Sequence, residues 1–335
     1  MAMLLKTDID RGDAWHRALR ACLPELPIHE WPYDGDPAEI EFALVWAPPR
    51  GALSRYTNLR AIFSMGAGID HLASDPDLPK GVPVVRMVEP GLTAGMIEYV
   101  LLAVLTHHRF MLDYAAQQRA KVWREISQIA ANQRRVGIMG LGVLGGAAAE
   151  KLIGLDFDVA GWSRSAKSQA GVTCFHGQDG LIPFLARTDI LVCLLPMTAE
   201  TDGILNARAF AALPRRAALV SVGRGGAVVE ADLLAALESG QIGGASLDVF
   251  RQEPLPPDSP FWTHPRVILT PHVASMTIPD SAAVAWPPTS AAYAPANRSN
   301  TWSTCGAGIR LTQASVWIPP YPRPGRRIRA SRPIP

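Results

Sequence analysis

The sequence predicts an α/β fold with two domains, each of which has a parallel β-sheet covered by helices. Short apolar, β-rich runs alternate with polar or helical stretches along most of the chain, a pattern typical of parallel strands connected through helices. Three later runs, DILVCLL, AALVSVG and GASLDVF, are almost continuously apolar, as expected of strands buried on both faces. At 335 residues the chain is too long for one compact core, so two domains are expected.

The first domain is expected in residues 1–95. Its predicted strands are the runs MLLKTDI, FALVW, AIFSMG and VPVVR, and the segment RGDAWHRALRACL is predicted as a helix after the first of them. Residues 93–121 are predicted as one long helix because of their length and lack of proline. We expect this helix to connect the two domains.

The second domain, residues 96–275, contains a glycine loop between a strand and a helix. Gly140, Gly142 and Gly145 form the pattern GLGVLG, directly after the strand VGIM and directly before the helical AAAEKL. The first glycine permits a tight turn, the second lets backbone approach a pyrophosphate, and the third allows close helix packing. The helix N-terminus, with Val143 and Leu144, offers N–H donors to an anion. The loop predicts a Rossmann-type dinucleotide site; the alternative is a glycine-rich turn without a ligand.

The end of the following strand, FDVAGWS, indicates which dinucleotide is bound. An NAD enzyme usually has Asp or Glu at this point to bind the ribose hydroxyls. This chain instead has Ser163, Arg164, Ser165 and Lys167, which favour the additional phosphate of NADPH. The residues therefore predict NADPH as the preferred cofactor, with NADH possible. The alternative is a solvated basic loop.

Composition narrows the class of protein. The early acidic residues of MAMLLKTDIDRGD do not fit a signal peptide, and no apolar run of 18 residues indicates a membrane span. The cysteines are far apart, without metal or redox spacing. Without the seven arginines of residues 284–335, the chain has 25 basic and 30 acidic residues, a net charge of −5. We therefore expect a cytoplasmic protein with no nucleic-acid partner, no membrane partner and no metal.

Three residues in distinct sequence contexts form a candidate catalytic set. Arg224 lies in SVGRGG, Glu253 in RQEPLP and His272 in LTPHVAS. A guanidinium binds a carboxylate through two parallel hydrogen bonds. A histidine transfers protons near neutral pH, and a neighbouring carboxylate favours its charged form and fixes its tautomer. Together with a hydride carrier, these groups would reduce the carbonyl of a 2-oxo acid.

The assembled motifs resemble those of the D-isomer-specific 2-hydroxyacid dehydrogenases, and within them the bacterial glyoxylate/hydroxypyruvate reductases of the A type. The resemblance extends from the N-terminus to about residue 283. It is carried by the motifs FSMGAGIDHL, EPGLTAGMIEYVL, GIMGLGVLG, GWSRS, LLPMTAETDGIL, VGRGGAVVEADLLAALESG, GASLDVFRQEPLP and LTPHVAS.

The resemblance implies a flavodoxin-like substrate domain, a Rossmann domain, an active-site cleft between them and a homodimer. It implies that Arg224 binds the substrate carboxylate, that His272 is the general acid and that Glu253 keeps His272 protonated. It adds substrate contacts at Trp46, Ala67 and Gly68, although Trp46 read without the family is more typical of a core residue. It also adds cofactor contacts at Pro196, Thr198, Val222 and Asp248. Pro196, Thr198 and Asp248 are equally compatible with ordinary loop positions.

The C-terminal tail departs from the family pattern. Residues 276–283 fit the start of a returning helix, whereas residues 284–335 are rich in Pro and Arg and predict an irregular, disordered segment. Codons read from Val284 with an offset of two bases permit GVAAHIRRIRAGQPFEHVVDLRRGY and then a stop codon, which is similar to the family's C-terminus. We interpret the tail as the product of a frame slip near residues 280–284, which resequencing the gene decides. The alternative is a divergent natural tail.

The function predicted is NADPH-dependent reduction of small 2-oxo acids, glyoxylate to glycolate and hydroxypyruvate to glycerate. One alternative is an NAD-linked D-2-hydroxyacid dehydrogenase with another substrate. Others are a corepressor that uses the dinucleotide as an assembly ligand, and a protein inactivated by its altered tail.

Overall fold

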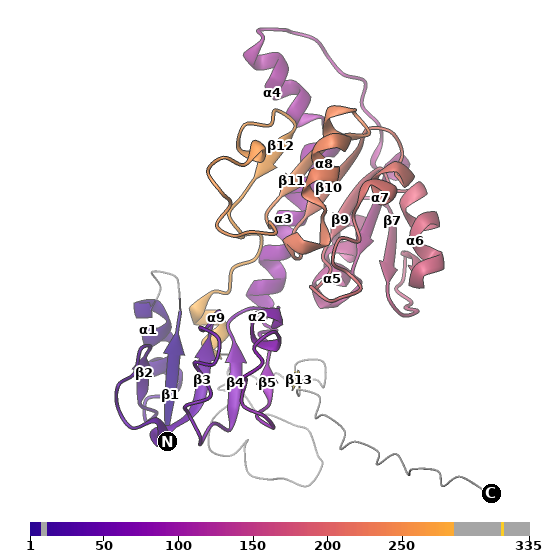
Figure 1. Cartoon of the computed structure of the whole chain (residues 1–335). Helices are drawn as coiled ribbons and strands as arrows, with labels where there is room; N and C mark the ends of the chain where they lie inside the picture. Colours follow the sequence, from indigo (N-terminus) through magenta and orange to yellow (C-terminus); the bar gives the residue numbers. More distant parts are fainter. Residues whose placement is uncertain (8–11, 285–315, 318–335) are drawn as a thin grey trace, which may run out of the picture. The chain divides into compact units, whose positions relative to one another are not determined.

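The structure, a computed structural model, describes residues 1–7, 12–284 and 316–317 (Figure 1). It divides into two compact units: unit 1 comprises Met1–Val88 and Pro279–Pro335, and unit 2 comprises Glu89–Ile278. The chain passes between the units a few residues away from the predicted boundaries at 95 and 275. The first crossing is earlier than predicted because helix α3 begins at Pro90 and lies wholly in unit 2.

Unit 1 contains a parallel sheet of five strands in the order β5-β4-β3-β1-β2. The four predicted apolar runs form β1, β3, β4 and β5, and the short edge strand β2 was not predicted. Helix α1 packs its buried Trp15 and Leu19 against the sheet. The elements are β1 (Ala2–Lys6), α1 (Gly12–Cys22), β2 (Ile28–Glu30), a 3₁₀ turn (Pro37–Glu39), β3 (Ile40–Val45), β4 (Ala61–Ser64), α2 (Asp70–Ala73) and β5 (Val84–Val85).

Two short elements from the end of the chain belong to unit 1. Helix α9 (Pro279–Val284) contacts α1, and its Ala282 and Ala283 are buried in the same core as Trp15. Strand β13 (Val316–Trp317) pairs antiparallel with β5. The prediction of an irregular tail is therefore wrong at these two residues, because their backbone completes an edge of the sheet. The rest of the tail lies outside the described residues, and the frame slip near residues 280–284 stays a prediction.

Unit 2 contains a parallel sheet of seven strands in the order β12-β11-β10-β9-β6-β7-β8. The predicted strands form β6, β7, β9, β10 and β11, and the edge strands β8 and β12 were not predicted. The elements are α3 (Pro90–His108), α4 (Met111–Arg119), β6 (Arg135–Met139), α5 (Val143–Ile153), β7 (Asp158–Ser163), β8 (Thr173–His176), α6 (Gly177–Ala186), β9 (Ile190–Cys193), α7 (Ala207–Ala212), β10 (Ala217–Ser221), α8 (Glu230–Glu238), β11 (Ile242–Leu247) and β12 (Val267–Leu269), with 3₁₀ turns at Ala131–Gln133, Gly225–Ala227 and Pro260–Trp262.

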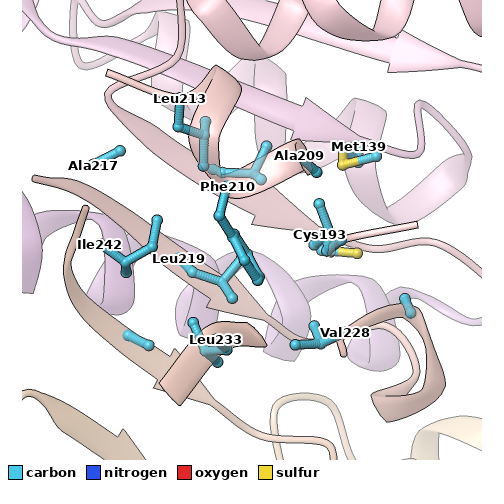
Figure 2. Packing of buried hydrophobic residues seen from close by; sticks show 14 of the residues in the cluster. Met139, Cys193, Ala209, Phe210, Leu213, Ala217, Leu219, Val228, Leu233 and Ile242 are labelled. Carbon is cyan, nitrogen blue, oxygen red and sulfur yellow. The ribbon is translucent and has the colours of Figure 1, made fainter. Parts of the chain in front are cut away.

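The sheet of unit 2 is buried on both faces, which explains its continuously apolar strands. In β9, Ile190 and Val192 join a core formed with α3 and α5, whereas Leu191 and Cys193 join a core formed with α6, α7 and α8. Figure 2 shows the second core, in which Phe210 of α7 packs among side chains from the strands and from α8. The predicted fold class, two parallel-sheet α/β domains, is confirmed.

The predicted single helix over residues 93–121 is wrong, because it is two helices. Phe110 separates α3 from α4 in the left-handed conformation, with φ at 56°, which cannot continue a right-handed helix. The guanidinium of Arg134 lies over the Phe110 ring at 5.8 Å. Because the two residues are far apart in the sequence, the helix propensities of residues 93–121 do not indicate this contact.

Helix α3 is long and apolar enough to cross a membrane if length and mean hydropathy, 1.2, are considered alone. In unit 2 it contributes Met96, Val100 and Val104 to the buried core between α3, α5 and the sheet. Its other face is apolar and exposed at Leu102 and Leu105. One face of the helix is therefore buried within unit 2, and no described residue covers its apolar face at Leu102 and Leu105.

Candidate active site

The predicted cofactor and catalytic residues of unit 2 follow the carboxyl ends of neighbouring parallel strands. Gly140 follows β6, Arg224 follows β10, Asp248 follows β11 and His272 follows β12. The strands β7 and β8 lie on one side of β6, and β9 to β12 lie on the other side. In such sheets ligands bind outside the carboxyl ends, at the point where the strand order reverses. The site is therefore expected next to β6 and β9.

The glycine loop has the geometry of a phosphate-binding turn. Gly140 has φ at +103°, which disfavours any side chain, and a Cβ on Gly145 would lie 2.0 Å from the Gly140 carbonyl oxygen. Gly142 is the N-cap of α5 and no side chain caps this end of the helix. The first N–H groups of α5, from Val143 and Leu144, therefore lack acceptors within the helix. This arrangement fits the pyrophosphate of a dinucleotide.

The segment after β7 is tied to the glycine loop. Lys167 Nζ donates a hydrogen bond of 2.7 Å to the Leu141 carbonyl, and the buried Ser163 donates through Oγ to the Ser165 carbonyl at 2.9 Å. Arg164 is exposed and lies close enough to the turn after β9 to affect a carboxyl there. The pKa of Glu200 is lowered by its hydrogen bond with Thr198, by a backbone hydrogen bond and by the charge of Arg164. Arg164 and Ser165 thus remain exposed beside the loop.

The turn after β9 is organised by a residue that was not predicted. Thr201 donates through Oγ1 to the Pro196 carbonyl at 2.6 Å, and its oxygen accepts the Thr198 N–H at 2.9 Å. Thr201 lies within the motif LLPMTAETDGIL, but the motif alone does not show which threonine orders the turn. Val222, after β10, is buried, and its N–H donates to the Cys193 carbonyl. A cofactor can therefore contact Val222 mainly through its other backbone atoms.

His272 and Glu253 form the central pair of the site. His272 Nδ1 lies 2.7 Å from Glu253 Oε2, and the Phe250 N–H donates to Glu253 Oε1 at 2.9 Å. Burial alone would raise the pKa of Glu253, but the hydrogen bonds from His272 and Phe250 and the charges of His272 and Arg224 together lower it. Because an ionised carboxylate only accepts, Nδ1 of His272 is the donor. Nε2 is then the ring nitrogen that does not bond Glu253.

Arg224 lies close to this pair. It is half-buried at the start of the 3₁₀ turn Gly225–Ala227, its Nη1 donates to the Gly223 carbonyl at 2.9 Å, and its charge contributes to the lowered pKa of Glu253. A Cβ on Gly225 would lie 1.9 Å from the backbone carbon of Phe250. The Arg224 turn therefore packs directly on the segment that holds Glu253. The structure brings the three predicted catalytic residues into one part of unit 2.

Asp248 is fully buried, and its carboxylate accepts hydrogen bonds from Thr270 Oγ1, Val273 N and Ala274 N. These bonds attach the His272 turn to the end of β11. Thr270 was missed in the sequence, although it stands two residues before His272 in the motif LTPHVAS.

The predicted substrate residues of unit 1 follow β3 and β4. Trp46 is half-buried, packs against the unit 1 core and lies over the turn at Gly66, where an added Cβ would be 2.6 Å from its ring. This packing agrees with a core role for Trp46. Ser64 Oγ donates to the Gly68 carbonyl at 3.0 Å. Within the described residues the backbone N–H groups of Ala67 and Gly68 donate to no acceptor, so this turn presents two adjacent donors.

A cavity of about 200 Å³ lies elsewhere in unit 2, at the amino ends of the strands. Its lining includes His107, Asp113, Arg134 and Arg266, and none of the predicted site residues. His107 Nε2 lies 3.0 Å from Ser246 Oγ, and burial, with the charge of Arg266, lowers the pKa of His107 to about 4 despite Asp113. His107 is therefore a neutral, half-buried residue in the lining of this cavity.

Comparison with known proteins agrees with this geometry. The model of the "D-isomer specific 2-hydroxyacid dehydrogenase, NAD binding domain" family matches residues 101–274. Glyoxylate/hydroxypyruvate reductase A from Klebsiella pneumoniae is 45% identical over 273 residues, 80% of this chain and 87% of that protein.

Two crystal structures also resemble the chain. A D-isomer specific 2-hydroxyacid dehydrogenase from Xanthobacter autotrophicus Py2, in complex with NADPH and MES, has a TM-score of 0.81 and 44% identity, covering 84% of this chain and 91% of that chain. An NADPH-dependent glyoxylate/hydroxypyruvate reductase from Sinorhizobium meliloti, in complex with NADP and sulfate, has a TM-score of 0.80 and 41% identity, covering 85% and 92%. The chain belongs to the D-isomer-specific 2-hydroxyacid dehydrogenase family.

Proposed function

We propose that this protein reduces small 2-oxo acids, with glyoxylate and hydroxypyruvate as substrates and NADPH as the preferred cofactor. The observation that carries the proposal is the pair of His272 and Glu253, joined at 2.7 Å at the carboxyl edge of the sheet that also bears the glycine loop. The relatives from Klebsiella pneumoniae and Sinorhizobium meliloti are named for these two substrates.

In this reaction Nε2 of His272 donates a proton to the carbonyl oxygen of the substrate. Glu253 orients the ring through Nδ1 and favours the charged imidazolium, which is the form that can donate. Arg224 binds the substrate carboxylate and compensates the negative charge that develops on the oxygen. When bound, NADPH supplies the hydride for the 2-oxo carbon.

The cofactor is held by the glycine loop and by the segment after β7. Gly140, Gly142 and Gly145, with the N–H groups of Val143 and Leu144, bind the pyrophosphate. Arg164 and Ser165 bind the additional phosphate of NADPH, since both are exposed beside the loop. Ser163 and Lys167 order this segment through their bonds to Ser165 and Leu141. The remaining cofactor contacts are proposed at Pro196, Thr198, Val222 and Asp248.

Ala67 and Gly68 are proposed to bind the substrate carboxylate through their backbone N–H groups. The support is that these two donors have no acceptor within the described residues. Trp46 is proposed as an apolar contact beside this turn, because its ring lies directly over Gly66.

We also propose a cytoplasmic homodimer. Helices α3 and α4 and the segment after α4 carry exposed apolar side chains in unit 2: Leu102 is 66% exposed, Met111 52% and Trp123 103%. Large apolar side chains exposed in this way are typical of a protein interface where they gather into a patch. The described cysteines, Cys22, Cys174 and Cys193, form no disulfide with one another, in keeping with a reducing compartment.

Initial rates test the proposal. Glyoxylate, hydroxypyruvate and pyruvate are each assayed with NADPH and with NADH. We expect the highest kcat/KM with NADPH and either glyoxylate or hydroxypyruvate. A higher kcat/KM with NADH would favour an NAD-linked dehydrogenase, and no turnover with either cofactor would favour a corepressor or an inactive protein.

A further inference from the structure

Asp248 is the centre of a hydrogen-bond network that extends beyond the proposed catalytic residues. Its side chain is buried, with 1% of the residue exposed. Oδ1 accepts from Thr270 Oγ1 at 2.6 Å and from the Val273 N–H at 2.8 Å, and Oδ2 accepts from the Ala274 N–H at 2.9 Å. One buried carboxylate therefore holds the chain on both sides of His272.

The direction of the hydrogen bonds follows from the available protons. A carboxylate only accepts, so the single hydroxyl proton of Thr270 is used on Asp248. The Tyr99 hydroxyl lies 2.6 Å from Thr270 Oγ1, and it must therefore be the donor. The network runs from Tyr99 to Thr270 to Asp248. Because Tyr99 belongs to α3, the network connects this helix to the His272 turn.

The backbone of His272 needs such support. Its φ is 55°, in the left-handed region that few residues other than glycine adopt. A conformation of this kind persists only where the surroundings hold it. The His272 N–H donates to the Asp248 carbonyl at 2.8 Å, and the direction of the imidazole toward Glu253 depends on this backbone. Loss of the restraints on residues 270–274 would let the turn relax and move Nε2.

We propose that Thr270 and Tyr99 are positioning residues for His272, acting in series through Asp248. The inference rests on the proposed function in one respect, that His272 is the proton donor. Displacement of a reacting group by about 1 Å can lower a rate by about 100-fold. Loss of the Thr270 or Tyr99 hydroxyl, which leaves Asp248 in place, should therefore affect the chemical step rather than the binding of substrate or cofactor.

Two substitutions of Thr270 distinguish the effect of its hydroxyl group from the effect of its side-chain shape. Thr270→Val removes the hydroxyl and keeps the shape, and we expect kcat to fall about 10- to 100-fold while KM for glyoxylate and Kd for NADPH change less than about twofold. Thr270→Ser restores the hydroxyl and should restore kcat to within about threefold. Tyr99→Phe should lower kcat by about three- to tenfold.

The double variant tests whether the two residues act in series. If they do, Tyr99→Phe combined with Thr270→Val has the kcat of Thr270→Val alone. Multiplied effects would contradict a serial network.

Thr188→Val is the matched control. Thr188 is fully buried in unit 2, whereas Thr270 is half-buried, and Thr188 Oγ1 donates to the Phe184 carbonyl at 2.8 Å, away from the candidate site. Its loss should lower Tm without changing kcat at temperatures where the protein is folded. Equal losses of kcat in Thr188→Val and Thr270→Val would overturn the positioning role.

Amide hydrogen exchange gives a readout that does not need activity. Exchange at Val273 and Ala274 should rise at least about tenfold in Thr270→Val, because Asp248 then holds these amides less firmly. If the natural chain reduces none of the acids tested, the proposed function fails and exchange alone decides whether the network orders the turn. Unchanged exchange in Thr270→Val, or unchanged kcat in an active protein, overturns the inference.

Discussion

Glu253 accepts a hydrogen bond of 2.7 Å from Nδ1 of His272, and the two side chains are 36% and 33% exposed. The pair is thus held in a fixed orientation while it still reaches solvent. The lowered pKa of Glu253 keeps its carboxylate ionised well below neutral pH. This relationship joins two loops that are 19 residues apart in the sequence.

Replacing Glu253 with Gln should lower kcat/KM for glyoxylate by roughly 10- to 100-fold, because a neutral amide does not stabilise the imidazolium. Steady-state rates of glyoxylate reduction measure the effect. Asp258→Asn, at an exposed carboxylate of the same loop, serves as the control, and a Glu253→Gln rate within twofold of the natural one would refute the role.

Arg164 should determine the choice of cofactor. In Arg164→Ala, KM for NADPH is expected to rise about 10- to 100-fold, the value of a charge-assisted hydrogen bond, with KM for NADH changed less than about twofold. Arg208→Ala removes another exposed arginine, on α7, as the control. Equal changes in KM for both cofactors would show that Arg164 does not contact the additional phosphate.

His107 should make the stability of unit 2 dependent on pH. Its pKa is about 4 in the folded protein and about 6.5 when exposed in the unfolded chain. The free energy of unfolding is therefore highest above pH 6.5, where His107 is neutral in both states, and it decreases as the pH falls through 4. About 2 kcal/mol of this free energy is lost between pH 7 and pH 5. Urea unfolding of His107→Gln at the two pH values should lack this difference, whereas the exposed control His176→Gln should retain it.

Trp123 should be a principal contact of the proposed dimer. Its side chain is 103% exposed in the chain taken alone, and large aromatic side chains often contribute more than 2 kcal/mol at the centre of an interface. Trp123→Ala should raise the dimer dissociation constant by about 30-fold or more. Light scattering after size-exclusion chromatography measures the mass. Trp262→Ala, at another exposed tryptophan, is the control, and a monomeric natural protein would exclude the dimer.

The inner strands of both sheets could be predicted because parallel strands buried on both faces are almost continuously apolar in sequence. The unpredicted strands β2, β8 and β12 are edge strands, and their residues are partly exposed, so they do not form such apolar runs. The division of α3 from α4 depends on the left-handed Phe110 beneath Arg134, a contact between residues 24 positions apart.

The same distinction applies to the candidate site. Glycine spacing and the residue types of the catalytic set could be read from local motifs. The bond between Tyr99 and Thr270 joins residues 171 positions apart, and no local pattern indicates that a tyrosine on α3 faces the end of β12. Thr201 was missed for a related reason, because its role depends on the conformation of the turn rather than on its composition.

The central claim, that His272 donates the proton while Glu253 orients it, is tested most directly in His272→Ala. The measurement is the steady-state rate of glyoxylate reduction, with NADPH affinity determined separately by fluorescence. We expect kcat to fall by about 100- to 10,000-fold, the usual contribution of a general acid, while Kd for NADPH changes less than about twofold. A kcat equal to that of the natural protein would contradict the account.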